Sequence, residues 1–215
     1  PPRGRYDREA SSEVPSIAAV LGRLLGLPSA RHLLTGSTLA SLVGFGLNGF
    51  FTFLLVRKFA MSLAQAAFFS ALLGSLPGAA SVLLGGKLAD RFGPARPGLY
   101  AAIPGCCLLL AAPIYIFAIP RDSAALLLAL VFVAALFQYT YLGVTYGVFQ
   151  NLLHSRMRAT GSALLNGIYT LVGQGLGALL VGALSDRLAP RYGSADGLAY
   201  AMAMTAAIYL WAAAH

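Results

Sequence analysis

The chain has 215 residues, of which 58% are hydrophobic and 10% are charged, and its mean hydropathy is +0.75. Soluble domains carry about 25% charged residues, so this composition excludes an ordinary water-facing surface and indicates a membrane protein. The formal net charge of +8 does not indicate nucleic-acid binding, because the basic residues lie in short clusters between apolar runs rather than on one face.

The chain begins with a polar segment, and we expect residues 1–30 to form a cytoplasmic linker. Within it, residues 15–27 are apolar but too few to cross a bilayer, which predicts a helix in the membrane interface. Six longer stretches follow, each with about the 20 mostly apolar residues that a spanning helix requires. The sequence therefore predicts an all-α fold with transmembrane helices over residues 33–56, 63–87, 98–119, 124–149, 159–185 and 197–214.

Lys and Arg are unevenly divided between the two sets of connecting segments. If the N-terminus is inside, ten of these residues fall on the inside, and five, including Arg57, Lys58 and Arg121, fall on the outside. Because cytoplasmic loops carry the excess of positive charge, the sequence predicts a multi-pass protein of the cell (inner) membrane with both termini in the cytoplasm.

Two similar charged segments interrupt the apolar runs. The first, "GGKLADRFGPARP" at residues 85–97, ends the second predicted span, and the second, "VGALSDRLAPRYG" at residues 181–193, ends the fifth. Since three spans separate them, the copies face opposite sides of the membrane, as inverted repeats of transporters do. Chance recurrence of a common helix-end turn is the alternative. The matched pairs are Leu84 with Leu180, Gly86 with Gly182, Leu88 with Leu184, Asp90 with Asp186, and Arg91 with Arg187.

Each charged segment places an acid beside an arginine at a helix end. A carboxylate is unfavourable at a helix C-terminus because of the dipole, and an arginine can bind a carboxylate or a phosphate in a bidentate manner. We interpret these residues as a conformational latch that forms in one state and breaks in another, with a solvated turn as the alternative. The predicted latch residues are Gly86, Asp90, Arg91, Gly93, Arg96, Asp186 and Arg187.

The first charged segment resembles the G-x-L-a-D-R-x-G-r-R signature of the major facilitator superfamily, although Pro97 replaces the second basic residue of the usual pair. Residues 156–188 look like the fifth helix of the second half of bacterial members, including spinster-like lipid transporters. This resemblance implies a twelve-helix protein made of two six-helix bundles, with alternating access around a central cavity. The signature residues retained here are Gly86, Leu88, Asp90, Arg91, Gly93 and Arg96.

The same resemblance implies that residues 31–215 form the C-terminal six-helix bundle and that residues 1–30 link it to a preceding bundle. The two inverted three-helix repeats are then residues 33–119 and 124–214. The expected partners are the N-terminal six-helix half of the same transporter, membrane lipid and an amphipathic small-molecule substrate, with no nucleic acid.

Polar side chains inside a membrane tend to face the interior of the bundle. The first, fourth and fifth spans carry polar residues at intervals of three to four, which places each set on one helix face. The third and sixth spans contain no Asn or Gln. Close packing of helices is the alternative interpretation, and it is the one we adopt for Gly74-x-x-x-Gly78 and Gly173-x-x-x-Gly177. The candidate substrate-cavity residues are Asn48, Thr52, Gln138, Tyr141, Asn166 and Tyr169.

The spans contain few polar side chains and many apolar ones, which favours an amphipathic or lipid-like substrate over a sugar. A drug or organic-anion carrier of the same superfamily and a non-transporting membrane scaffold are the alternatives. The sequence has no paired acids near a nucleophile and no metal-ligand spacing, so no enzyme, cofactor or metal is predicted. No charged residue falls near the middle of a span, and any proton or ion coupling is therefore assigned to the missing N-terminal half.

Overall fold

The computed structural model describes residues 16–93, 96 and 98–215, which are mainly helical and contain no strand. The first 15 residues of the predicted linker and Pro97 lie outside this part of the chain. In chain order the elements are α1 (Ile17–Gly26), α2 (Pro28–Phe59), α3 (Leu63–Phe92), α4 (Leu99–Ala118), α5 (Ala124–Gln138), α6 (Thr140–Leu152), the 3-10 helix η1 (Ser155–Met157), α7 (Arg158–Ile168), the π-helical segment η2 (Tyr169–Leu176), α8 (Gly177–Ala206) and α9 (Ile208–Ala214).

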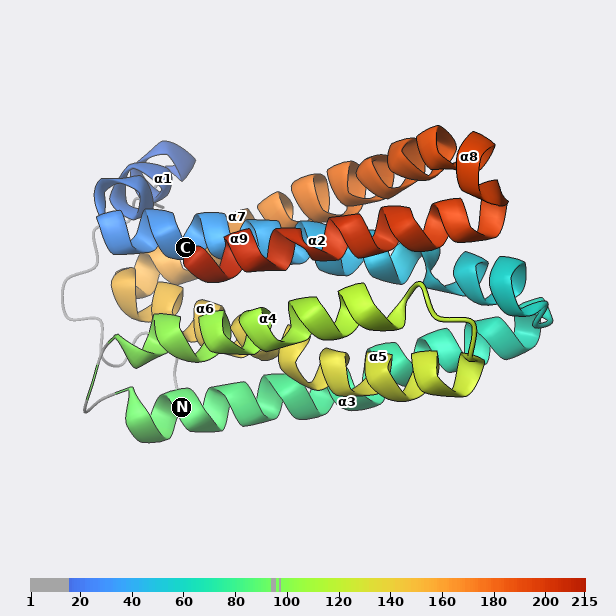
Figure 1. Cartoon of the computed structure of the whole chain (residues 1–215). Helices are drawn as coiled ribbons and strands as arrows, with labels where there is room; N and C mark the ends of the chain where they lie inside the picture. The colour runs from blue at the N-terminus through green and yellow to red at the C-terminus, as the bar shows by residue number, and fades with distance from the viewer. Residues whose placement is uncertain (1–15, 94–95, 97) are drawn as a thin grey trace.

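The chain runs the length of the bundle six times, and we call each of these runs a pass. The helices α2, α3 and α4 each provide one pass, and α5 with α6 provides the fourth. The fifth pass is α7, η2 and the first part of α8, and the sixth is the rest of α8 with α9 (Figure 1). The reversal lies within α8 at Gly193, whose φ of 81° suits glycine. The predicted all-α fold is confirmed, and each pass corresponds to one predicted span.

The length and apolar character of the passes suit a bilayer. Four segments each hold one pass that is long and apolar enough to cross a membrane, and a fifth, Ser155–Ala214, holds the last two passes. Helices satisfy their own backbone hydrogen bonds, which a lipid environment requires. Serine side chains cap the starts of two of these passes: Ser62 forms a capping box with Gln65 at α3, and Ser123 accepts from the amide of Leu126 at α5.

The helix α2 is the centre of the packing, with α3, α8, α9 and η2 around it. Its contact with α8 brings two backbones together. A Cβ atom added at Gly177 would lie 2.3 Å from the carbonyl oxygen of Leu42, and one added at Gly46 would lie 2.9 Å from the carbonyl oxygen of Gly177. Only glycine permits this approach, which supports the packing role predicted for Gly177.

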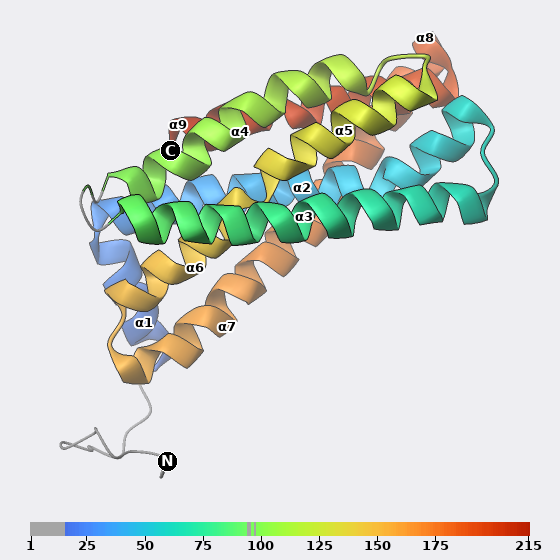
Figure 2. The same cartoon turned by 90° about the horizontal axis from the view of Figure 1, so that it is seen from below.

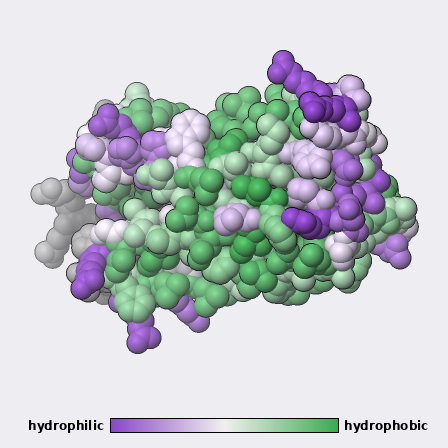
Figure 3. Space-filling view, in the orientation of Figure 1, coloured by the Kyte–Doolittle hydropathy of each residue, from purple (hydrophilic) through white to green (hydrophobic). Residues whose placement is uncertain are grey.

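Charged groups gather at the two ends of the bundle, and hydrophobic residues cover the middle (Figure 3). Of the described residues, seven cations lie at the end where α2 begins, which we call the basic end, with one acid, Asp90. Five cations and three acids lie at the opposite end. The cations of the basic end are Arg23, Arg31, Lys87, Arg91, Arg96, Arg156 and Arg158; those of the opposite end are Arg57, Lys58, Arg121, Arg187 and Arg191.

Two ion pairs tie three segments together at the opposite end. The Nζ atom of Lys58, at the end of α2, lies 2.9 Å from Oδ1 of Asp122 and 2.5 Å from Oδ1 of Asp196. Asp122 belongs to the turn between α4 and α5, and Asp196 follows the reversal in α8. The Lys58 side chain is 6% exposed, whereas Asp122 is 95% and Asp196 49% exposed, so the pair with Asp196 is the less screened by solvent.

Substitution of Gly177 tests the close contact between α2 and α8. Gly177→Ala should lower the free energy of unfolding by about 1–3 kcal/mol, because overpacking forces the two backbones apart. Gly175→Ala is the matched control: no atom lies within 4 Å of its added Cβ, and alanine is a better helix former than glycine. Thermal unfolding in detergent measures both, and equal melting temperatures for the two variants would contradict the contact.

Candidate functional site

Four of the six predicted cavity residues line one cavity of about 460 Å³, which we call the central pocket. Its walls come from α2, α3, α6, α7 and η2, with Tyr139 between α5 and α6. Seen from below, α6 lies between α3 and α7 (Figure 2). The predicted residues in its wall are Asn48, Tyr141, Asn166 and Tyr169.

Amide and hydroxyl groups meet in pairs around this pocket. The Nδ2 atom of Asn48 donates a hydrogen bond of 2.6 Å to the hydroxyl of Tyr139. The hydroxyl of Tyr146 donates to Oδ1 of Asn166. Tyr169 packs edge-on against the rings of Tyr141 and Tyr146, at centroid distances of 6.4 Å and 6.1 Å. Polar groups are thus placed within a largely aromatic and aliphatic wall.

Two interruptions of regular α-helix flank the central pocket. The fourth pass breaks at Tyr139, between α5 and α6, where ψ is 0°. The fifth pass widens into a π-helix from Tyr169 to Leu176. Both interruptions begin at a tyrosine that lines the pocket. Segments of π-helix are frequent at functional sites, and broken helices line the substrate sites of many transporters.

The other two predicted cavity residues lie elsewhere. Thr52 donates a hydrogen bond of 2.8 Å from its hydroxyl to that of Ser70 on α3. Gln138 is 1% exposed, and its Oε1 atom accepts a hydrogen bond from the hydroxyl of Tyr115. Both side chains therefore join helices within the bundle instead of lining the central pocket.

The structure adds two tyrosines that were absent from the predicted cavity set. Tyr139 and Tyr146 both line the central pocket and each hydrogen-bonds to a predicted asparagine. Tyr146 lies seven positions after Tyr139, a spacing that returns to the same face of a helix. That spacing could have identified them, but the helix break at Tyr139 changes which residues share a face.

The predicted latch residues divide between the two ends of the bundle. Asp90 and Arg91 lie in the last turn of α3, at the basic end, while Asp186 and Arg187 lie in α8 toward the opposite end. Both carboxylates are exposed, and within the described part of the chain neither has an ion-pair partner within 4.0 Å. Gly86 lies in α3 and Gly93 directly follows it, and the Arg96 amide donates to the carbonyl of Gly93.

The central pocket has the chemistry of a binding site for uncharged polar groups. Its amides and hydroxyls donate and accept hydrogen bonds, but none of its lining residues is a carboxylate, a histidine or a cation. Over residues 16–93, 96 and 98–215, no three His, Cys, Asp or Glu side chains come together as metal ligands. The arrangement can hold and orient a molecule through hydrogen bonds.

No family model matches the chain. One relative is an MFS-type efflux pump of Mycolicibacterium smegmatis, which is 30% identical over 199 residues, or 88% of this chain and 46% of the relative. The chain therefore spans about half the length of this protein.

Two solved structures have a similar fold, one of them over the whole chain. Both are crystal structures of a bacterial homologue of the human lysosomal transporter Spinster in an inward-facing conformation. The unoccupied form is 28% identical with a TM-score of 0.82, covering 100% of this chain and 52% of the homologue. The occupied form is 29% identical with a TM-score of 0.76, covering 85% of this chain and 47% of the homologue.

Proposed function

We propose that this chain is the C-terminal half of a secondary transporter. It has the fold of one six-helix half of a major facilitator superfamily transporter and is similar to a bacterial homologue of Spinster. The proposed transporter moves an amphipathic or lipid-like substrate by alternating access. Its partner would be the N-terminal six-helix half, with the central cavity between the two.

The observation that carries this proposal is the central pocket and its position. Asn48 and Asn166 are exposed although they lie within passes long enough to span a membrane. Amides facing hydrocarbon are costly, so this side of the bundle needs water or protein against it. A second bundle enclosing an aqueous cavity supplies both, and it accounts for the coverage of about half of each relative.

The composition of the pocket wall supports an amphipathic substrate. A few hydrogen-bonding groups stand beside Phe45, Val82 and Leu142, which suits a molecule with a small polar part and a large apolar part. A sugar would require more donors and acceptors. The described acids all lie near the ends of the passes, so we assign any proton or ion coupling to the partner half.

We place the basic end in the cytoplasm, because positive charge accumulates on that side of a membrane. The helix α1 lies there and packs through Val20 and Leu24 onto α2 and α7. Such a helix suits the end of a cytoplasmic linker between two bundles in a cell (inner) membrane protein. The two halves of the chain, residues 33–119 and 124–214, are proposed to be inverted repeats.

We propose the latch as a contact between the two bundles. Asp90, Arg91 and Arg96 are exposed at the basic end, where they are available to charged groups of the partner half in one conformation. The corresponding pair at the opposite end, Asp186 and Arg187, would serve the alternate conformation.

A drug or organic-anion carrier is the second candidate, favoured by the relative described as an efflux pump. Uptake of lysolipids and of hydrophobic drugs into vesicles that contain the full-length protein distinguishes the two candidates. Uptake of a lysolipid with no uptake of the drugs supports the first proposal, and the reverse supports the second.

Asn166→Ala should weaken substrate binding about fivefold, since one hydrogen bond contributes about 1 kcal/mol. Gln174→Ala removes an amide from the same pass that does not line the central pocket and should bind normally. Equilibrium binding of a radiolabelled substrate measures both variants. If both bind like the unaltered protein, Asn166 does not belong to the site.

Asp90→Asn should reduce the transport rate about tenfold or more while leaving expression unchanged, because a charge-assisted contact contributes about 1.5–3 kcal/mol. Lys87→Gln removes a nearby exposed charge on α3 that is not part of the predicted latch. It is the control and should transport at the normal rate. Initial rates of uptake into vesicles are the measurement, and an unchanged rate for Asp90→Asn would eliminate the latch.

A further inference from the structure

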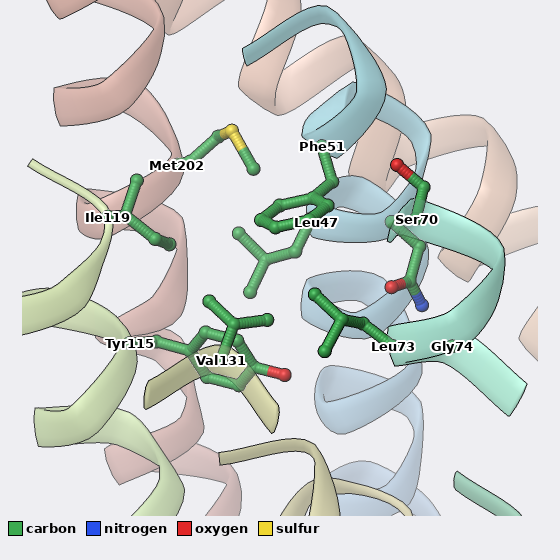
Figure 4. A pocket seen from close by; sticks show the side chains of 10 residues that line it. Leu47, Phe51, Ser70, Leu73, Gly74, Tyr115, Ile119, Val131 and Met202 are labelled. Carbon is green, nitrogen blue, oxygen red and sulfur yellow. The ribbon is translucent and has the colours of Figure 1, made fainter. Parts of the chain in front are cut away.

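A second cavity of about 260 Å³ lies between α2, α3, α4, α5 and α8. We call it the core pocket (Figure 4). Protein interiors are packed as densely as organic crystals and contain few voids larger than a water molecule. A cavity of this size against the buried core therefore requires an explanation, although Asn48 at its edge is exposed. Its apolar walls are Leu47, Phe51, Leu73, Ile119, Val131 and Met202, each at most 6% exposed.

Each polar side chain in the wall of the core pocket makes at least one hydrogen bond within the bundle. Asn48 donates to Tyr139, and Tyr115 donates to Gln138. Ser70 accepts from Thr52 and donates to the carbonyl oxygen of Ala66. The rest of the lining is made of apolar side chains and Gly74. Apolar cavities of about 150 Å³ in other proteins stay dry and bind hydrocarbon molecules.

Asn48 connects the core pocket to the central pocket, since it lines both. A ligand that reached past Asn48 would extend from the amides and tyrosines of the central pocket to the apolar side chains of the core pocket. The change from polar to apolar lining at one residue matches a molecule with a polar head and a hydrocarbon tail.

We propose that the core pocket receives the hydrocarbon tail of a single-chain amphiphile whose polar head lies in the central pocket, with Asn48 at the junction. This proposal rests on the proposed function and adds where each part of the substrate binds. Each methylene group buried contributes about 0.8 kcal/mol, so affinity should rise about fourfold per methylene until the core pocket is full.

Gly74 provides a way to fill this pocket selectively. The sequence interpretation of Gly74-x-x-x-Gly78 as packing holds for Gly78, whose added Cβ would lie 3.3 Å from the ring of Tyr139. It is wrong for Gly74, which lines the core pocket and has no atom within 4 Å of an added Cβ. Gly74→Leu should therefore occupy the cavity without displacing backbone. Gly22→Leu, in α1, is the matched control because its added Cβ is equally free.

Two photoreactive lysophospholipids test the proposal in the full-length transporter in lipid nanodiscs. One carries a diazirine on the last carbon of its acyl chain and the other carries it beside the head group. We expect the first to label Leu73 or Met202 and the second to label residues of the central pocket. Gly74→Leu should abolish labelling of the core pocket, retain labelling of the central pocket and flatten the dependence of affinity on chain length. Gly22→Leu should behave as the unaltered protein.

The remaining outcomes separate the two proposals. Head-group labelling of the central pocket, with the chain-end probe labelling only residues outside the core pocket, would overturn the tail site and leave the proposed function standing. No labelling of either pocket by either probe would contradict the proposed lipid-like substrate and the tail site together. The labelling of the unaltered protein decides these cases even if Gly74→Leu does not fold.

Discussion

The cost of exposing polar groups to hydrocarbon organises this structure. Backbone groups satisfy each other within helices because lipid offers them no partner, and charged side chains stay at the two ends of the bundle. Polar side chains within the passes either pair inside the bundle, as Thr52 does with Ser70, or gather around the central pocket, as Asn48 and Asn166 do. The same cost thus shapes the fold and marks the candidate site.

The bundle combines a close contact between α2 and α8 with two passes whose helix is interrupted. At Gly177 the absence of a side chain lets the backbones touch and fixes α8 against α2. At Tyr139 and along η2 the helices depart from regular geometry beside the central pocket. A close backbone contact therefore lies next to irregular helix within the same bundle. The core pocket adjoins the central pocket at Asn48 of α2, which lines both.

The sequence predicted the six passes because stretches of apolar residues of a given length have a direct physical meaning in a bilayer. It also identified four residues of the central pocket from helical periodicity. Periodicity did not distinguish Thr52 and Gln138, which lie on the same stripes but pair with neighbouring helices. The helix break at Tyr139 and the π-segment at η2 arise from packing between passes, so local sequence patterns did not reveal them. Nor did the pattern of glycines reveal that Gly74 faces a cavity while Gly78 packs against Tyr139.

The most direct measurement of the central claim is the water accessibility of the face that carries the central pocket. In the full-length transporter with Cys106 and Cys107 replaced by alanine, the account predicts that Asn166→Cys reacts rapidly with a water-soluble maleimide in lipid vesicles. Thr205→Cys, at a position 1% exposed within the bundle, should stay unreacted. Equal protection of both cysteines would contradict the account, because the polar face would then be sealed by packing with no cavity for a substrate.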